Sequence, residues 1–163
     1  MVIFYEQPIV GFEIENDMIS KGANIITDLL RIIYVSEPFG FDAPSLSGIL
    51  LDARTNNIRD DITGALVCRH DVYLQLLEGP ANKVEATFER ISRDDRHVGI
   101  RKLTSSHVTD RIFGDWAMLH DPEKTWIWTE AEMSDGILNR LAPSDFEKVF
   151  EDLAEKVQNE TLT

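Results

Sequence analysis

Residues 62–79, ITGALVCRHDVYLQLLEG, are the stretch that decides the fold. Two runs rich in apolar and β-branched residues, ITGALVCR and VYLQLLEG, are separated only by the polar His70 and Asp71. Two such runs with so short a polar connection are typical of antiparallel strands joined as a hairpin. The sequence therefore predicts a hairpin near the middle of the chain.

Three further runs are predicted to be strands. The first lies around Leu29–Val35 and is rich in β-branched and aromatic residues. The other two span residues 98–108 and 112–119, and Pro122 is expected to break the second of them. The chain thus has one predicted strand before the hairpin and two after it.

Two helices are predicted between these strands. The first has apolar residues at helical spacing from Leu46 to Ala53, with Ser45 placed to cap its first turn. Asn56 and Asn57 are expected to end it, because asparagine tolerates the left-handed conformation that closes helices. The second helix opens at Pro80 and carries one buried stripe. That stripe consists of Val84, Phe88 and Ile91.

The predicted order, βαββαββ, favours the α+β class. We expect a ferredoxin-like sandwich, in which a five-stranded mixed sheet carries both helices on one face and is followed by C-terminal helices. The length of 163 residues is that of one ordinary domain with extensions. The expected limits are an N-terminal extension over residues 1–28, the α+β domain over 29–120 and a C-terminal helical extension over 121–163.

The last helix is predicted from its start signal. Ser144 is a good N-cap, and Glu147 completes a capping box. One apolar stripe follows, made of Phe146, Val149, Phe150, Leu153 and Val157. This stripe needs a partner surface, so the extension is expected to pack on the domain or on a neighbouring chain. The segment around Trp126 and Trp128 has no predicted structure.

The composition is that of a globular protein with an acidic surface. Apolar residues make up 43%, charged residues 28%, and the formal net charge is -13. Such a surface repels nucleic acids and anionic membranes, so direct binding to either is not expected. Cys68 is the only cysteine, which excludes an internal disulfide. No stretch reads as a signal peptide or a bilayer-spanning segment, and a cytoplasmic location is expected.

Gln75 is the most unusual residue, because it lies at the centre of YLQLLEG among apolar neighbours. Alternation places it on the same face as Tyr73 and Leu77. A buried amide without hydrogen-bond partners costs roughly 1–3 kcal/mol, so a buried Gln75 needs a polar side chain, the backbone or a ligand. The alternative is that Gln75 points outward on a half-solvated sheet, and the strand alone does not decide between the two.

Other candidate residues have ordinary structural explanations when each is taken alone. Tyr34, expected on the same side of its strand as Ile32 and Ser36, can pack in the core with its hydroxyl satisfied locally. Trp116 and Met118, two residues apart on the predicted last strand, are expected to share a face, and core filling explains such a pair.

The polar candidates also have plain explanations. Arg90, Asp94, Arg96 and His97 cluster at the end of the second helix, as expected of an exposed charged helix end. The four histidines lack the spacing of a helical zinc pair, so no metal site is predicted. No GxGxxG, Walker or GxSxG motif supports a dinucleotide, phosphate-loop or hydrolase function.

The short motifs carry more information together than singly. IIYVS, ARTNN, ITGAL, YLQLLEGP, RISRDDRH and RIFGDWAM follow one another in this order. In this combination the sequence resembles the BLUF family, the blue-light sensors using flavin, over about residues 29–119. The resemblance implies a five-stranded sheet with a flavin held between two helices. It also implies FAD rather than FMN, because the family usually carries FAD.

The resemblance implies roles for individual residues. Tyr34 corresponds to the electron-donating tyrosine, and Gln75 to the glutamine that switches hydrogen bonds between that phenol and the flavin. Trp116 and Met118 correspond to a pair that exchanges places near Gln75 during signalling. The other implied flavin contacts are Ile49 on the ring face, Asn56 and Asn57 at the pyrimidine carbonyls, Arg90 and Asp94 along the pyrimidine edge, and Arg96 and His97 in the RH that follows.

The expected function is that of a stand-alone blue-light receptor without enzymatic activity of its own. Its signal is expected to pass to a separate effector, namely a cyclic-nucleotide or cyclic-di-nucleotide enzyme or a transcriptional regulator, and the extensions are expected to support a homo-oligomer. Two alternatives stay open. One is a flavin-dependent redox enzyme, for which no second substrate constellation is visible. The other is a flavin-free interaction module, suggested by the acidic surface and the last helix.

Overall fold

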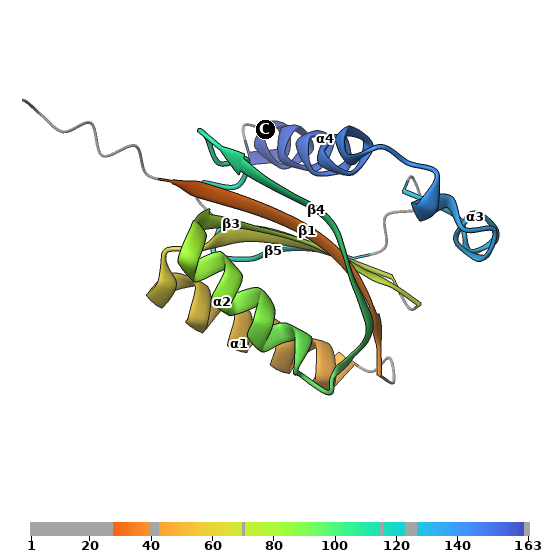
Figure 1. The fold of residues 1–163 in the computed structure, drawn as a ribbon, viewed down its shortest axis with the longest axis horizontal. Helices are drawn as coiled ribbons and strands as arrows, with labels where there is room; N and C mark the ends of the chain where they lie inside the picture. Colours follow the sequence, from red (N-terminus) through yellow and green to blue (C-terminus); the bar gives the residue numbers. More distant parts are fainter. Residues whose placement is uncertain (1–27, 40–42, 70, 115, 123–126, 162–163) are drawn as a thin grey trace, which may run out of the picture.

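The computed structural model describes residues 28–39, 43–69, 71–114, 116–122 and 127–161. The strands are β1 (Leu29–Pro38), β2 (Thr63–Cys68), β3 (Tyr73–Pro80), β4 (His97–Val108) and β5 (Leu119–Pro122). The helices are α1 (Ala43–Asp60), α2 (Ala81–Ser92), α3 (Glu130–Ser134), the 3-10 helix η1 (Ile137–Asn139) and α4 (Pro143–Thr161). The predicted βαββαββ order and the C-terminal helices are confirmed (Figure 1).

The five strands form one mixed sheet in the order β4-β1-β3-β2-β5. Neighbouring strands are antiparallel except for β2 and β5, which are parallel. The predicted hairpin joins β2 to β3, and Arg69 and Val72 exchange backbone hydrogen bonds at its turn. The predicted ferredoxin-like α+β sandwich with a five-stranded mixed sheet is therefore confirmed.

The pairing of β1 with the edge strand β4 is interrupted twice. The register shifts between Ile33 and Tyr34 and again between Val35 and Glu37. Gly99 lies opposite the second shift and has φ of 60°, a conformation that favours glycine because it has no Cβ. Such irregularities bend a strand and increase its twist.

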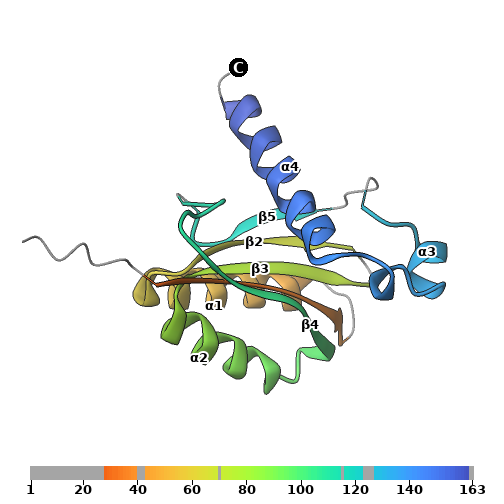
Figure 2. The ribbon, with the colours of Figure 1, turned by 45° about the horizontal axis from the view of Figure 1, so that its top comes forward.

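Helices cover both faces of the sheet (Figure 2). On the face of α1 and α2, the core contains alternate residues of β1 and β3, among them Ile32, Tyr34 and Leu77. On the opposite face, Ile33 and Leu76 belong to a second core with α4. The predicted α4 stripe supplies Phe146, Val149, Phe150 and Leu153 to this core, with Val157 at its margin. The partner surface of the last helix is thus the sheet itself.

The predicted end of α1 is wrong by one turn. The helix continues through Asn56 and Asn57 to Asp60, and Asp61 adopts the left-handed conformation with φ of 54°. The Ile62 N–H then donates to the Asn57 C=O at 2.9 Å, which is the closure of a Schellman motif. The Asn57 side chain is held by the backbone of Ala117, so tertiary contacts override its local tendency to stop a helix.

The predicted cap of α4 is also wrong. The helix begins at Pro143, as suits a residue without an N–H at the first helical position, and Ser144 lies inside the first turn. The Asp145 carboxylate accepts the Ala142 N–H at 2.8 Å in place of the predicted capping box. A complete capping box occurs instead at α3, between Thr129 and Glu132.

The predicted last strand, 112–119, is wrong except for its final residue. Residues 112–118 run in bends and turns where they are described, and β5 spans Leu119–Pro122. Pro122 is therefore the last residue of the strand and not its breaker. Proline is tolerated there because the strand lies at the edge of the sheet.

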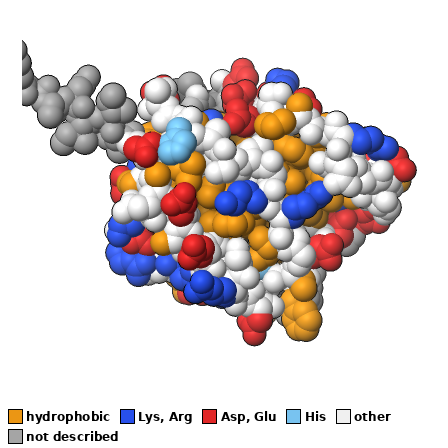
Figure 3. Space-filling view, in the orientation of Figure 1, with side chains coloured by type: hydrophobic (Ala, Val, Ile, Leu, Met, Phe, Trp, Pro, Cys, Tyr) orange, Lys and Arg blue, Asp and Glu red, His pale blue; other side chains and the backbone are white. Residues whose placement is uncertain are grey.

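The surface seen in Figure 3 carries acidic and basic side chains beside one another, with apolar patches between them. On this face the basic side chains do not merge into one continuous patch. Among the residues that the structure describes, no helix is both long and apolar enough to cross a membrane.

Candidate functional site

Tyr34 and Gln75 lie directly opposite each other on β1 and β3. Both side chains are buried, and Gln75 is only 2% exposed. The Tyr34 hydroxyl donates a hydrogen bond to the side-chain oxygen of Gln75. The outward orientation that the sequence left open for Gln75 is therefore wrong, and Tyr34 supplies the polar partner that a buried amide requires.

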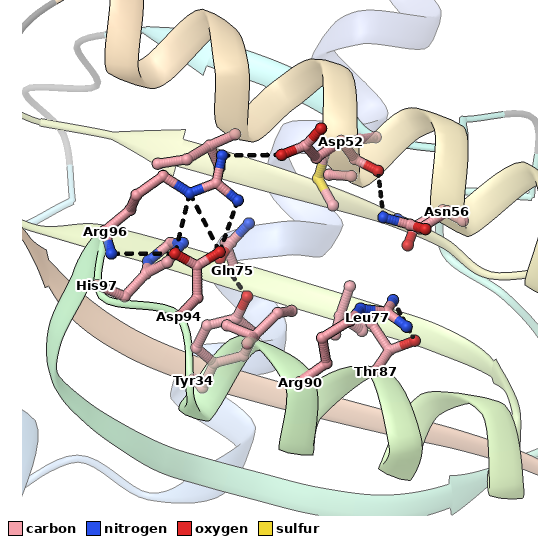
Figure 4. A pocket seen from close by; sticks show the side chains of 15 residues that line it. Tyr34, Asp52, Asn56, Gln75, Leu77, Thr87, Arg90, Asp94, Arg96 and His97 are labelled. Atoms are coloured by element: carbon pink, nitrogen blue, oxygen red, sulfur yellow. Dashed lines mark hydrogen bonds and ion pairs between the residues drawn. The ribbon is translucent and has the colours of Figure 1, made fainter.

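These two side chains form part of the wall of a cavity of about 200 Å³, which α1, α2 and the sheet enclose (Figure 4). Every residue that the sequence singled out as a flavin contact lines this cavity. They are Tyr34, Ile49, Asn56, Asn57, Gln75, Arg90, Asp94, Arg96 and His97. Residues far apart in the sequence are thus brought together at one place.

Five further lining residues were missed by sequence analysis: Asp52, Ala53, Leu77, Thr87 and Ile91. The spacing of these residues in the sequence could have identified them. Asp52 and Ala53 lie three and four residues after Ile49, and the same interval separates Thr87 from Arg90 and Ile91, so each set shares one face of a helix. Leu77 follows Gln75 by two residues and therefore shares its face of β3.

Arg96 joins the two sides of the cavity. One terminal guanidinium nitrogen lies 2.8 Å from Asp52 on α1, and the other lies 2.6 Å from Asp94 in the loop between α2 and β4 (Figure 4). The hydrogen bonds from Arg96 lower the pKa of Asp94, so this carboxylate stays ionised. The bridge fixes α1 relative to the loop that leads into β4 at His97.

Burial keeps Tyr34 neutral. Loss of water raises the pKa of its phenol above the ordinary value, and the Asp94 carboxylate raises it further. The ring also packs edge-on against Phe88 of α2, with 5.2 Å between the ring centroids. A neutral, fixed phenol can donate a hydrogen bond to Gln75 at all pH values near neutrality.

His97 is buried and lies against Ser36, with 2.9 Å between His97 Nδ1 and Ser36 Oγ. Burial lowers the pKa of His97, Asp94 raises it, and Arg96 lowers it to a smaller extent. The net shift is downward, so the imidazole is neutral at pH 7. His97 thus adds a polar but uncharged group to the cavity wall.

Met118 and Trp116 do not share a face, contrary to the prediction. Met118 is 3% exposed and lines the cavity, whereas Trp116 is 42% exposed and lies outside the set of lining residues. Both precede β5, so the alternation of a strand does not apply to them. The arrangement in this structure therefore has methionine inside and tryptophan outside.

The lining suits a flat heterocycle with one polar edge. Ile49, Leu77 and Ile91 are apolar, while Asn56 and Arg90 bring hydrogen-bonding groups to the same cavity. Pockets for whole small-molecule ligands usually measure about 300–1,000 Å³. At about 200 Å³ this cavity is smaller than that range, so it has room for only part of a large ligand.

The family model described as sensors of blue light using FAD matches residues 29–119. The chain belongs to the BLUF family. BLUF domains are sensory modules that bind flavin, and the match covers β1 to β4 and both helices that enclose the cavity.

Curated BLUF relatives are much longer than this chain. The photoactivated adenylate cyclase subunit beta of Euglena gracilis is 29% identical over 102 residues, which are 61% of this chain and 12% of that protein. The blue light- and temperature-regulated antirepressor BluF of Escherichia coli (strain K12) is 35% identical over 66 residues, 40% of this chain and 16% of that protein. The part of each relative that matches this chain is therefore less than a fifth of that relative's length.

Two solved structures share the fold, those of BlrB, described as a BLUF protein, and of BlsA. The dark-state structure of BlrB has a TM-score of 0.66 and 27% identity, and the similarity covers 80% of this chain and 98% of that one. The ground state of BlsA has a TM-score of 0.66 and 28% identity, over 77% of this chain and 87% of that one. The similarity to both therefore extends over about three quarters of this chain or more.

Proposed function

We propose that this chain is a blue-light receptor in which Tyr34 and Gln75 form the photoactive pair beside a flavin in the α1–α2 cavity. The observation that carries the proposal is the hydrogen bond from the Tyr34 hydroxyl to Gln75 in the cavity wall. A light sensor of this kind acts without a substrate, and we propose no enzymatic turnover for the chain.

The chemistry of the pair follows from its groups. A bound flavin supplies absorption of blue light and, when excited, a strong oxidant for which Tyr34 is the electron donor. The phenol would become far more acidic on losing an electron, so its proton would move along the hydrogen bond to the Gln75 oxygen. The electron and a proton would then return to Tyr34, the proton through the same amide, so that neither is lost. An amide has one donor end and one acceptor end, so rotation or tautomerisation of Gln75 exchanges its hydrogen bonds without breaking a covalent bond. Reversal in the dark restores the original pair.

The remaining cavity residues would hold the cofactor. Asn56 and Asn57 are proposed for the pyrimidine carbonyls, with Ile49 on the ring face. The other proposed contacts along this edge are Arg90, Asp94, Arg96 and His97. FAD is proposed rather than FMN, which accords with the family description.

The chain is proposed to divide at residues 28 and 120 into an N-terminal extension, the sensor and a C-terminal extension. Trp116 and Met118, at the end of the sensor, are proposed to carry the signal. The receiver is proposed to be a separate effector protein, either a nucleotide-cyclising or cyclic-di-nucleotide enzyme or a transcriptional regulator. A cytoplasmic homo-oligomer is proposed, with no direct contact to nucleic acid or membrane.

The test is an absorption spectrum of the purified chain before and after blue light. We expect a yellow protein whose flavin bands shift slightly to the red and return in the dark. Gln75→Leu and Tyr34→Phe should each abolish this photocycle while flavin stays bound. The matched control is Tyr73→Phe, a buried tyrosine on the same face that does not line the cavity. A colourless protein that takes up no flavin contradicts the proposal.

The same preparation separates a receptor from a flavin-dependent redox enzyme. A receptor should show no rapid reduction of its flavin when a nicotinamide cofactor is added in the dark. Rapid reduction would favour the enzyme instead.

A further inference from the structure

Three consecutive backbone carbonyls between the cavity and β5 are each bound by a different donor. The Trp116 C=O accepts the Gly64 N–H at 3.0 Å. The Ala117 C=O accepts the Asn57 side-chain amide at 2.7 Å, and the Met118 C=O accepts Arg54 Nε at 3.3 Å. Residues 116–118 are thus fixed by β2 on one side and by α1 on the other.

The two α1 donors differ in what else they contact. Asn57 is buried and lines the cavity, so its substitution would disturb the cofactor site directly. Arg54 is exposed, three residues earlier on the helix, and does not line the cavity. Among the residues that the structure describes, the Met118 carbonyl is the one hydrogen-bond partner found for Arg54. Arg54 therefore contacts the segment without contacting the cavity.

The backbone that Arg54 holds determines where two side chains point. Met118 lies in the cavity wall, and Trp116 is 42% exposed. Exchanging these positions requires residues 116–118 to move, and that movement must break the bonds to their carbonyls. A bond from a guanidinium to a carbonyl is charge-assisted and stronger than a neutral one. Its loss therefore favours any arrangement in which the segment is displaced.

We propose that Arg54 is a positioning residue that holds Met118 inside the cavity and Trp116 at the surface. The proposal concerns the arrangement of the chain itself. It deepens the proposed function in one respect, because Arg54 then sets how easily the segment beside the photoactive pair moves after illumination.

The first experiment observes Trp116 directly in the full chain. The three tryptophans are labelled as 5-fluorotryptophan, and the ¹⁹F resonance of Trp116 is assigned with Trp116→Phe. In the dark, Arg54→Ala should raise the population of a solvent-protected Trp116 about threefold to tenfold, the range produced by losing one ordinary hydrogen bond, since this bond is long and its donor exposed. Arg54→Lys, which keeps the charge and a donor, should restore part of the original population.

The matched control is Arg59→Ala on the same helix. Arg59 is exposed and pairs with Asp60, so this variant removes a cation without removing a contact to residues 116–118. It should leave the Trp116 resonance unchanged. If Arg54→Ala and Arg59→Ala give the same Trp116 spectrum as the unmodified chain, the proposal is overturned.

The second experiment measures dark recovery of the illuminated protein. Arg54→Ala should change the recovery rate about threefold to tenfold while flavin content and the size of the red shift stay unchanged. An unchanged rate, or a loss of bound flavin, contradicts a positioning role. If the chain binds no flavin at all, the function proposed above fails, while the dark ¹⁹F comparison still decides the role of Arg54.

Discussion

The guanidinium of Arg31 and the carboxylate of Glu78 face each other across β1 and β3, with 3.1 Å between Nε and Oε2. Glu78 is fully buried and also accepts the backbone N–H groups of Ile112 and Phe113, at 3.0 and 2.6 Å. Arg31 donates in turn to the Asp110 C=O at 2.9 Å. The pair therefore ties the segment that follows β4 to the two central strands.

Glu78→Ala should destabilise the fold strongly. It leaves Arg31 buried without its anion and removes the acceptor of two N–H groups, and breaking a buried pair in this way costs about 3–5 kcal/mol. Urea denaturation measures the free energy of unfolding. Asp152→Ala, which breaks the exposed pair with Lys148, is the control and should cost less than about 1 kcal/mol. If both variants lose a similar amount of unfolding free energy, the buried pair stabilises the fold no more than the exposed pair does.

Stability should fall at high pH because of Tyr34. Burial raises the pKa of Tyr34 in the folded chain, whereas the unfolded phenol ionises near about pH 10. Below that pH the phenol is protonated in both the folded and the unfolded chain, and Tyr34 makes its full contribution to the free energy of unfolding. Above that pH only the unfolded chain releases the proton, so this contribution is lost. The unfolding free energy of the unmodified chain should therefore fall relative to Tyr34→Phe between about pH 10 and 11. If the unfolding free energies of the two proteins change in parallel with pH, the pKa of Tyr34 is not raised in the folded chain.

Stability should also fall at mildly acid pH because of His97. Its folded pKa is lowered, chiefly by burial, so the contribution is present above about pH 6.5 and is lost as the pH falls toward the folded pKa. The slope should reach at most about 1.4 kcal/mol per pH unit between about pH 6.5 and 5.5. His97→Asn keeps a polar atom for Ser36 and should lack this loss of stability at mildly acid pH. His107→Asn, at an exposed position, should retain it.

Asp52→Asn should loosen the cavity without unfolding the chain. It frees α1 from Arg96, whose other carboxylate partner, Asp94, remains. Because this pair is partly exposed, it is worth less than about 1 kcal/mol, and flavin release should accelerate about twofold to fivefold. Asp60→Asn, at another α1 carboxylate with cationic partners, should not change the release rate. Equal acceleration in both would assign the effect to charge alone.

The features that local pattern determines were predicted from the sequence. The hairpin, the order of elements and the face shared by Gln75 and Leu77 follow from alternation and turn composition, which act over a few residues. The clustering of Tyr34, Asn57, Asp94 and the other cavity residues came from the motif combination, since none of them is distinctive alone.

The errors share a physical origin in distant contacts. Asn57 ends helices by local preference, yet its amide is held by a carbonyl 60 residues away, and α1 continues past it. Trp116 and Met118 have the spacing of one strand face, but only the Trp116 carbonyl is bound by a strand residue, Gly64 of β2, whereas the Met118 carbonyl is bound by Arg54 of α1. Arg54 escaped notice because a side chain that binds a remote backbone atom leaves no local signature.

The broken register between β1 and β4 has a consequence for self-association. A long, regular edge strand offers its free backbone groups to another chain, whereas bulges and charged side chains discourage such pairing. β4 is 12 residues long and has both features that discourage pairing with another chain. Its register shifts twice against β1, and Arg101 and Lys102 are exposed on it. The opposite edge, β5, is only four residues long. Copies of this chain that associate would therefore meet through helices or loops, and the sheet would stay five strands wide.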